Sequence, residues 1–467
     1  MTVASYRPTI FKKCKKIYHF LSSCQQQASR DQQVKLANIS LPMADIEPWQ
    51  ALAHFDTPAH FYYGSTQQTF VGIGSAISQQ ASGSNRFDRI QQFIDVWKRR
   101  VLSAREIGPL VSPYFLCRFT FFDQVSKSDP FSPAQVFVPQ LQLTSRQGCT
   151  TASFNYLVDD TSHITSIVDD IGQQLQELEY AARAGQPSIH TLPSRVTKDV
   201  GNFREMVANV LPMLNGSRLR KVVLAEALDV LAARPFNVPA SLRNLEKIYG
   251  GCYVFSISDE PGTVFLGASP ERLLSISSNS HSRRLITDAL AGSAPRGENA
   301  QTDSRIGKQL FQSSKERYEH QIVVNFIVKQ LAHLSIQSNF SSVPQLLKLA
   351  NIQHLHTPIR ATLPQHIEPL QIVKQLHPTP AVAGLPRTSA SQILQTAEMF
   401  ERSLYAAPLG WIDASGNSEF VVGIRSALVR DRQARLFAGA GIVAQSAPDR
   451  ELNEVQLKLQ ALLGALV

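Results

Sequence analysis

The stretch Leu436-Phe-Ala-Gly-Ala-Gly-Ile-Val-Ala-Gln-Ser-Ala-Pro-Asp-Arg-Glu-Leu-Asn-Glu-Val-Gln-Leu-Lys458 joins an apolar strand to an amphipathic helix that begins near Pro448. Gly439 and Gly441 lie toward the end of the strand, and glycine lets a backbone approach a ligand closely. The helix repeats apolar residues at helical spacing, which predicts a face packed in the core. The stretch therefore predicts a strand followed by a helix, with room for a ligand at the strand's end.

Charged residues form a second row on this helix, beside the apolar one. Glu451, Glu454 and Lys458 follow one another at helical spacing and so lie on one face. Such a row is commonly a solvated face with one Glu–Lys pair. Beyond a glycine-containing strand end, carboxylates also suit Mg²⁺, which prefers oxygen ligands and often takes only one or two from the protein. The pattern leaves both interpretations open.

The rest of the chain mixes strands and helices without strict alternation. Residues 35–160 indicate strands broken by turns. The other expected elements are helices over 164–184, 200–214 and 303–334, a strand over 221–230, and hairpins of 252–258 with 263–276 and of 420–429 with 435–443. We therefore expect an α+β fold with large, mainly antiparallel sheets and flanking helices.

The composition is typical of a globular protein. Apolar residues make up 43% of the 467 residues, which is enough for a large core. No uninterrupted apolar run approaches the length of a transmembrane helix, so we expect no stable membrane insertion. The five cysteines are scattered and form no CxxC pair, which argues against a disulfide framework or a zinc site and favours a reducing, cytoplasmic compartment.

The N-terminal segment is basic, and residues 1–30 contain no acidic side chain. We expect residues 1–34 to form a flexible basic arm and residues 35–467 a single domain, with the candidate site residues within 200–467. A targeting peptide, a membrane-surface arm and a nucleic-acid arm are alternatives for the first segment. Much of the net charge of +9 lies in this arm, so the remainder gives little reason to expect a nucleic-acid partner.

Two charged residues fall inside apolar patterns, where a charge is costly unless it is paired or binds a ligand. Glu319 precedes Ile322 and Phe326 by three and seven residues, which places it on the apolar face of its helix. Arg425 interrupts the strand expected over 420–429, where bidentate capture of a carboxylate suits its guanidinium. A satisfied core carboxylate and an internal salt bridge are the respective alternatives.

Lys221 and Glu271 are weaker signals when taken alone. Lys221 opens an apolar strand, a place where lysine is usually exposed. Glu271 lies in the apolar stretch 266–274.

Together these segments resemble the chorismate-utilising enzymes, a family that includes isochorismate, salicylate, anthranilate and aminodeoxychorismate synthases. The matching blocks, in family order, are KVVLA from 221, FLGASPERLL from 265, LAGSAPRG from 290, SKERYEH from 314, HLHTP from 354, HPTPAVAGLPR from 377, GWIDASGNSEFVVGIRSA from 410 and LFAGAGIVAQSAPDRELNEVQLK from 436. The resemblance implies two packed sheet-and-helix halves with the active site between them.

Three positions distinguish members of this family. Lys221 stands where isochorismate and salicylate synthases have lysine and anthranilate synthases have glutamine. Ala291 replaces the nucleophilic lysine of aminodeoxychorismate synthases, and Ser293 is more similar to isochorismate than to salicylate synthases. The resemblance thus implies an isochorismate synthase, which adds water at C2 of chorismate with loss of the C4 hydroxyl. A salicylate synthase, which would also release pyruvate, is the main alternative, ahead of anthranilate-type amination and of a non-enzymatic binder.

The resemblance also implies residue roles. Lys221 would be the general base, and Glu271 the general acid with a raised pKa. Glu319 and Glu454 would hold Mg²⁺, with Glu451 and Glu419 near the metal but not bound to it. The substrate would contact Gly292, Ser293, His354, Ala381, Tyr405, Arg425, Gly439, Gly441 and Lys458.

Two positions depart from the family pattern. Glu226 stands where the family has arginine, and Ala407 stands where it has glycine. We expect both to shape the pocket or an interface without removing a catalytic group. The long N-terminal region is more similar to members that feed menaquinone or phylloquinone synthesis than to siderophore enzymes. We expect a monomer or a weak homo-oligomer.

Overall fold

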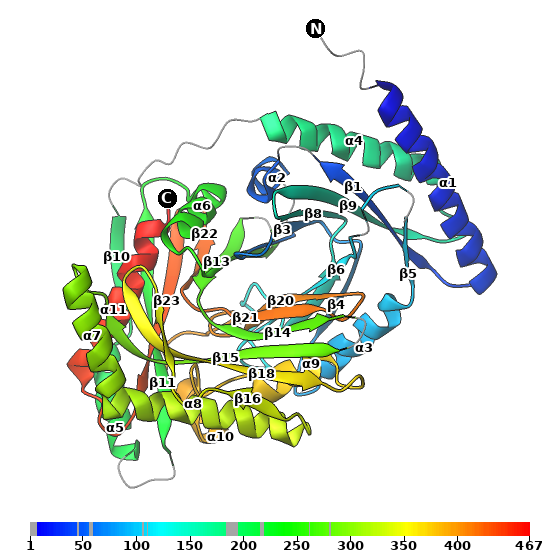
Figure 1. Ribbon diagram of the computed structural model, residues 1–467. Coiled ribbons are helices and arrows are strands. Elements are labelled where there is room, and N and C mark those ends of the chain that lie inside the picture. The colour runs from blue at the N-terminus through cyan, green and yellow to red at the C-terminus, as the bar shows by residue number, and fades with distance from the viewer. Residues whose placement is uncertain are drawn as a thin grey trace.

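The computed structural model describes residues 7–43, 46–55, 59–104, 107–109, 111–183, 195–214, 219–260, 262–279 and 282–467. They form helices around two large sheets (Figure 1). The helices are α1 (Arg7–Asp31), α2 (Pro48–His54), α3 (Arg86–Lys98), α4 (Ile164–Arg183), α5 (Phe203–Leu214), α6 (Val238–Ile248), α7 (Ala300–Gln312), α8 (Ser314–His333), α9 (Pro369–Leu376), α10 (Arg387–Ala397) and α11 (Pro448–Ala465).

The first sheet has thirteen strands. In spatial order they are β10 (Arg195–Val200), β11 (Lys221–Ala232), β23 (Gln433–Ile442), β22 (Ser426–Arg430), β13 (Thr263–Ser269), β12 (Tyr253–Glu260), β2 (His60–Gly64), β3 (Thr69–Ile73), β8 (Leu141–Arg146), β9 (Cys149–Val158), β1 (Lys35–Met43) and β5 (Val101–Ser103), with β19 (Gly384–Leu385) paired to β11.

The second sheet has ten strands. In order they are β16 (Ser338–Phe340), β18 (Ile352–Leu363), β15 (Arg283–Pro295), β14 (Arg272–Ser278), β21 (Ser418–Val422), β20 (Pro408–Asp413), β6 (Tyr114–Phe119), β7 (Ala134–Val138) and β4 (Ile77–Ala81), with β17 (Gln345–Lys348) paired to β18. The strand pairs are antiparallel except for β1 with β5, which confirms the expected α+β class.

Two strands expected to be continuous instead pass from one sheet to the other. The strand expected over 263–276 breaks after Ser269, and the chain leaves β13 in the first sheet for β14 in the second. The strand expected over 420–429 breaks at 423–425, between β21 and β22. Arg425 has a φ of 52°, which no regular strand accommodates. Both predicted hairpins were therefore wrong at these points.

The two crossings lie side by side. The amide of Ala268 donates to the carbonyl of Arg425 at 3.0 Å, and the amide of Val422 donates to the carbonyl of Glu271 at 3.0 Å. These hydrogen bonds satisfy backbone groups that the sheets leave free where the strands part. They place Glu271 and Arg425 in the seam between the sheets.

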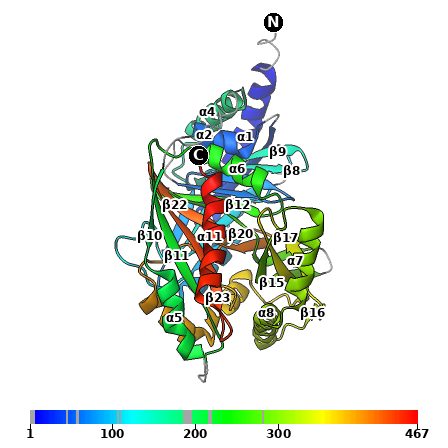
Figure 2. The ribbon, with the colours of Figure 1, turned by 90° about the vertical axis from the view of Figure 1, so that its left-hand side faces the viewer.

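The helix expected over 303–334 is two helices. α7 ends at Gln312, and α8 restarts after Ser313, whose ψ of 115° is not helical and whose hydroxyl accepts a hydrogen bond from the Glu316 amide. Figure 2 shows α11 in front of β11 and β23, with α7 and α8 beside β15. α8, which contains Glu319, and α11, which contains Glu451 and Glu454, therefore cover the same end of the molecule.

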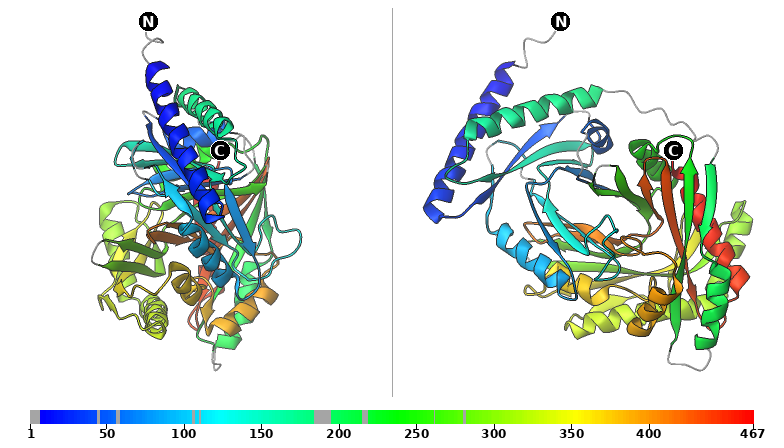
Figure 3. Two further views of the ribbon diagram at one scale, coloured as in Figure 1. Left: turned by 90° about the vertical axis from the view of Figure 1, so that its right-hand side faces the viewer. Right: turned by 180° about the vertical axis from the view of Figure 1, so that it is seen from behind.

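We expected residues 1–34 to form a flexible arm. From residue 14 onward, this segment instead packs on the rest of the molecule. α1 buries Ile17, Leu21, Cys24 and Ala28 at helical spacing, and it packs on α4, β1 and β9. The cluster of lysines that precedes Ile17 indicated a basic arm, and the apolar face that follows it was missed in the sequence. Residues 1–6 lie outside the described part of the chain. α1 and α4 lie at the end of the molecule away from α11 (Figure 3).

Among the described residues, no helix is both long and apolar enough to cross a membrane.

Replacement of Leu21 by alanine tests the packing of α1. Leu21 is completely buried, so we expect its truncation to lower the free energy of unfolding by about 2–4 kcal/mol through loss of apolar contact and the cavity left behind. Urea denaturation of the full chain measures this change. The matched control is Gln26→Ala on the exposed side of the same helix, which should have little effect. A flexible arm would leave both variants as stable as the parent.

Candidate active site

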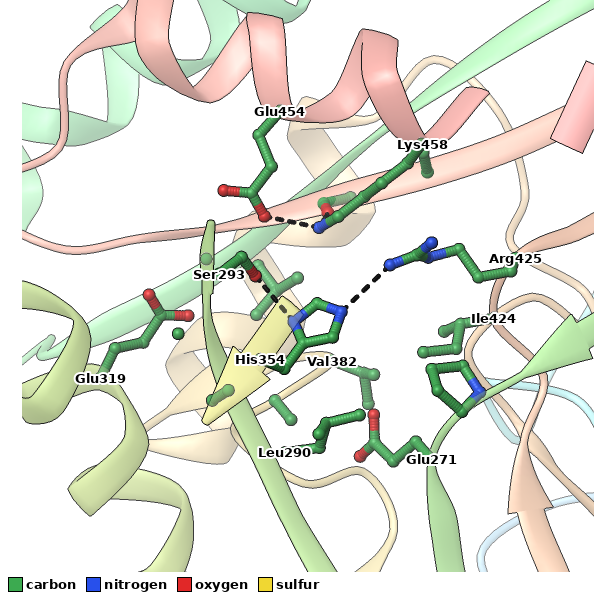
Figure 4. A pocket seen from close by; sticks show the side chains of 18 of the residues that line it. Glu271, Leu290, Ser293, Glu319, His354, Val382, Ile424, Arg425, Glu454 and Lys458 are labelled. Atoms are coloured by element: carbon green, nitrogen blue, oxygen red, sulfur yellow. Dashed lines mark hydrogen bonds and ion pairs between the residues drawn. The ribbon is translucent and has the colours of Figure 1, made fainter. Parts of the chain in front are cut away.

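A cavity of about 670 Å³ opens in the seam between the sheets, a size suited to a small ligand. Its lining residues are Val223, Pro270, Glu271, Leu290, Ala291, Gly292, Ser293, Glu319, His354, Ala381, Val382, Tyr405, Ile424, Arg425, Ala438, Gly439, Gly441, Glu454 and Lys458. This set includes every residue predicted to contact substrate or metal. Figure 4 shows their charged groups arranged around His354.

Lys221 lies beneath the cavity wall, completely buried at the start of β11. Its Nζ lies 2.8 Å from Oε1 of Glu319 on α8. The pair passes over Gly441, where a Cβ atom would come within 2.1 Å of that oxygen and 2.8 Å of the Lys221 Cε. Gly441 is therefore required so that the Lys221–Glu319 pair can lie against the backbone of β23, as the glycines of the opening stretch predicted.

Glu454 and Lys458 form a second pair, one turn apart on α11. Lys458 Nζ lies 2.6 Å from Oε1 of Glu454 and donates to the Gly439 carbonyl at 2.7 Å. Burial acts to raise the pKa of Glu454, but the charge and hydrogen bond of Lys458 outweigh it and hold the pKa at about 2. Glu454 is therefore ionised at neutral pH. The solvated-face interpretation of this row is wrong for these two residues.

Glu316 is a buried acid that the sequence analysis missed. It lies one turn before Glu319, and its carboxylate accepts hydrogen bonds from the Ser293 amide and from Arg450. Burial, followed by the charge of Glu319, raises its pKa. The helical spacing that drew attention to Glu319 would also have selected Glu316. Glu451, predicted near the metal, is buried and bound to Lys315 at 2.6 Å.

These carboxylates have the chemistry of a Mg²⁺ site. Glu319 and Glu454 both line the cavity, and Mg²⁺ needs only one or two protein carboxylates besides water and substrate oxygens. Within the described part of the chain, no three His, Cys, Asp or Glu side chains are grouped closely enough to hold a metal as they stand. Glu319 instead contacts Lys221, and Glu454 contacts Lys458. A divalent cation could take the place of these lysines as the positive partner.

Glu271 projects into the cavity from the crossing between β13 and β14. It is 3% exposed, and its pKa is raised to about 8. Burial is the main cause. The charge of Lys221 opposes the shift, and that of Asp288 adds to it. Glu271 therefore carries a proton at neutral pH, as a general acid requires.

Arg425 reaches the cavity from the other crossing. It is 6% exposed, and Nη1 is buried without a hydrogen-bond partner. Its Nη2 donates to Nε2 of His354 at 3.2 Å, and no carboxylate in the described residues forms an ion pair with it. The internal salt bridge considered from the sequence is therefore not present. A buried guanidinium without a counter-charge is expected to bind an anion.

His354 connects Arg425 to Ser293. Its Nδ1 lies 3.0 Å from the Ser293 hydroxyl. Burial, together with the charge of Arg425, lowers the pKa of His354 to about 3, so the ring is neutral. Arginine can only donate, so Nε2 accepts and Nδ1 carries the hydrogen that Ser293 receives. A bulge in β15 between Ala291 and Ser293, with Gly292 at a φ of 78°, turns this part of the strand toward the cavity.

The remaining predicted residues fall in two groups. Ala381 and Tyr405 line the cavity as expected, and the Tyr405 hydroxyl lies 2.9 Å from the position of a Cβ on Gly439. Glu419, predicted near the metal, is not among the residues that line the cavity, and its oxygens accept hydrogen bonds from Tyr63 and Tyr253. Its position in the matching block gave no indication of this.

Neither departure from the family pattern falls on the cavity. The carboxylate of Glu226 accepts from the amide of Phe203 and so caps the start of α5. Ala407 is buried in the core before β20.

Comparison with known proteins places this cavity in context. The family model for "Chorismate binding enzyme" matches residues 20–467. The isochorismate synthase MenF of Bacillus subtilis is 31% identical over 90% of this chain and 92% of its own length. The salicylate biosynthesis isochorismate synthase of Pseudomonas aeruginosa is 32% identical over 92% of this chain and 90% of its own length.

Solved structures show the same fold. The menaquinone-specific isochorismate synthase MenF of Escherichia coli superposes with a TM-score of 0.74 at 26% identity, over 92% of this chain and 94% of that one. Anthranilate synthase component I of Streptococcus pneumoniae superposes with a TM-score of 0.66 at 16% identity, over 85% of this chain and 92% of that one. The family match begins inside α1, consistent with the packing of that helix on the body.

The neutral state of His354 predicts a specific loss of stability in acid. Its pKa is about 3 in the folded protein, against 6.5 for an unperturbed histidine, so between these values the unfolded chain binds the extra proton. Stability therefore falls as the pH drops below about 6.5, by up to about 1.4 kcal/mol per pH unit for this residue. His354→Gln should reduce the pH slope of the unfolding free energy between pH 6 and pH 4 by about this amount.

Urea denaturation at several pH values measures that slope. His333→Gln serves as the matched control, because His333 is exposed at the end of α8. An unchanged slope in His354→Gln would show that the ring is not held neutral.

Proposed function

The chain belongs to the chorismate binding enzymes, and from this membership we propose that it is an isochorismate synthase, which converts chorismate to isochorismate. The observation that carries the proposal is that a buried lysine and a buried carboxyl meet at one cavity. Lys221 lies beneath the cavity wall, and Glu271 projects into it. Addition of water with loss of a hydroxyl needs one group that takes a proton and one that gives a proton.

The two groups divide the reaction between them. The Lys221 amine takes a proton from the water that bonds to C2. Both ring double bonds shift, and the bond from C4 to its hydroxyl breaks as Glu271 supplies a proton, so that the hydroxyl leaves as water. A lysine rather than a glutamine at position 221 favours water over ammonia as the nucleophile.

The substrate carboxylates have two matching partners. Arg425 presents a buried guanidinium without a counter-charge, and a carboxylate would supply that charge. His354 and Ser293 hold the guanidinium and so fix where it can bind. Lys458 and the backbone of Gly439 border the same cavity from α11 and β23.

We propose that Glu319 and Glu454 hold Mg²⁺ at the same end of the cavity. When bound, the ion would orient the ring carboxylate and stabilise charge that is pushed into the ring. A Glu319 that held the ion would no longer neutralise the Lys221 ammonium, which has to lose its own proton before the amine can take one from water. Glu316 and Glu451, each bound to a basic residue, add negative charge nearby.

We further propose that the product enters menaquinone or phylloquinone synthesis, supported by the likeness to MenF proteins. The protein would act in the cytoplasm as a monomer or weak homo-oligomer. All five cysteines are free, which suits a reducing compartment.

The first test is product formation from chorismate and Mg²⁺. We expect isochorismate without pyruvate, followed by chromatography and a lactate dehydrogenase-coupled assay. Lys221→Ala and Glu271→Gln should each lower kcat by at least about a hundredfold, because each removes one proton-transfer group. Lys198→Ala, on the exposed face of β10, is the control and should retain full activity. Stoichiometric pyruvate would instead identify a salicylate synthase, and normal turnover in both active-site variants would refute the proposed function.

The second test concerns the metal. Activity should disappear with a chelator and return with Mg²⁺. Binding of Mn²⁺, followed by electron paramagnetic resonance without substrate, should weaken at least about tenfold in Glu319→Gln and in Glu454→Gln. Glu401→Gln, whose carboxylate binds Ser126 outside the cavity, should bind Mn²⁺ as the parent does. Equal binding in all four proteins would remove these residues as metal ligands.

A further inference from the structure

A second cavity, of about 1000 Å³, lies beside α8, and we call it the α8 pocket. It shares no lining residue with the active-site cavity, and its size suits a small organic molecule. Its lining residues come from the start of β11, from α8, and from the chain between β19 and α10. They are Arg220, Tyr318, Gln321, Ile322, Asn325, Phe326, Lys329, Gln330, Leu385, Pro386 and Arg387.

The charged groups of the α8 pocket are all basic. Arg220, Lys329 and Arg387 line it, and among the described residues no aspartate or glutamate does so. Arg220 and Lys329 are exposed. Arg387 is held in place, because its Nη2 donates to the carbonyl of Gln375 at 2.8 Å and its guanidinium lies 4.9 Å from the centre of the Phe326 ring. Positive charge that no carboxylate of the cavity wall neutralises favours an anionic ligand.

The same pocket has an apolar, partly aromatic surface. Tyr318, Ile322 and Phe326 follow one another at intervals of four residues on α8, so they share one face of the helix. Ile322 and Phe326 are buried, whereas Tyr318 is 46% exposed and presents its ring to a ligand. Leu385 and Pro386 line the pocket as well. An inorganic anion would leave these surfaces uncovered, so the lining favours an anion attached to a flat ring.

The α8 pocket adjoins the Lys221–Glu319 pair through both elements that carry it. Arg220 directly precedes Lys221, and its amide donates to the carbonyl of Leu385 at 2.8 Å. Ile322 lies one turn after Glu319 on α8. A ligand that contacts both elements would hold α8 against the start of β11 and so stabilise the 2.8 Å contact of the pair. In the proposed mechanism Glu319 instead holds the metal, so such a ligand would reduce activity.

We propose that the α8 pocket binds a small aromatic carboxylate, and that the bound ligand inhibits the enzyme by stabilising the contact between Lys221 and Glu319. The carboxylate pairs with Arg220 and Lys329, and the ring covers the apolar face of α8 beside Tyr318. The inhibition rests on the proposed function, whereas the binding does not.

Calorimetric titration of the full-length protein with 2-naphthoate tests the binding. We expect one site per chain, with an affinity that falls about fivefold in Arg220→Gln and in Lys329→Gln, because each variant removes one charged partner. The neutral alcohol 2-naphthalenemethanol, which keeps the ring, should bind the parent at least about fivefold more weakly than 2-naphthoate does. Lys308→Gln, an exposed position on α7 outside the pocket, is the matched control and should bind 2-naphthoate as the parent does.

Arg425→Gln distinguishes the two cavities. It removes the unpaired guanidinium of the active site and should leave the affinity for 2-naphthoate unchanged. Absence of binding to the parent, loss of binding in Arg425→Gln, parental affinity in both Arg220→Gln and Lys329→Gln, or equal affinity for the alcohol would each overturn the α8 pocket as a carboxylate site.

Activity with Mg²⁺ and chorismate tests the inhibition. Saturating 2-naphthoate should lower kcat of the parent by about fivefold or more, and excess chorismate should not restore it. Lys329→Gln should match the parent without 2-naphthoate and need more of it for the same inhibition. An unchanged kcat, or full relief by chorismate, would overturn the link to the Lys221–Glu319 pair. If the parent makes no isochorismate, the proposed function fails, yet calorimetry still decides whether the α8 pocket binds the carboxylate.

Discussion

Two backbone hydrogen bonds join the places where the chain passes between the sheets. The amide of Ala268 binds the carbonyl of Arg425, and the amide of Val422 binds the carbonyl of Glu271. Each bond compensates backbone groups that lose their sheet partners at a crossing. Because the crossings stabilise each other, the Glu271 carboxyl and the Arg425 guanidinium face one cavity although they lie far apart in the sequence. The positions of Glu271 and Arg425 therefore follow from the sheet topology and do not depend on a mobile loop.

The charges of the site are held in a buried environment by pairing. Lys221 with Glu319 and Lys458 with Glu454 are matched ion pairs. Among the described residues, Arg425 has no carboxylate partner and contacts a neutral histidine. Burial without pairing is unfavourable, so an unpaired group in such a site marks the place where a ligand is expected to supply the missing charge. The same rule explains why Glu271, which has no basic contact within the described part of the chain, keeps its proton.

The sequence was a reliable guide where one pattern dominated. The glycines of β23 and the helix α11 fell where they were predicted, and the residues predicted to contact substrate or metal line one cavity. The predicted strand bounds were wrong where apolar residues continue through a change of sheet, as at Pro270 and at Ile424. The alternation of residues in a strand does not indicate which sheet the strand joins. The prediction also failed for α1, whose apolar face follows a cluster of lysines. The burial of Lys221 could not be inferred from a strand-opening position, and only the family resemblance singled it out.

The crossings also constrain motion. Two covalent links run between the sheets at the floor of the cavity, in opposite directions, so the sheets cannot separate as hinged lobes without breaking strand pairing on both sides. Small displacements of α8 and α11, which pack on the sheets through side chains, remain as the means of admitting a ligand. The enzyme is therefore expected to bind its substrate by local rearrangement around a rigid floor rather than by closing two domains over it.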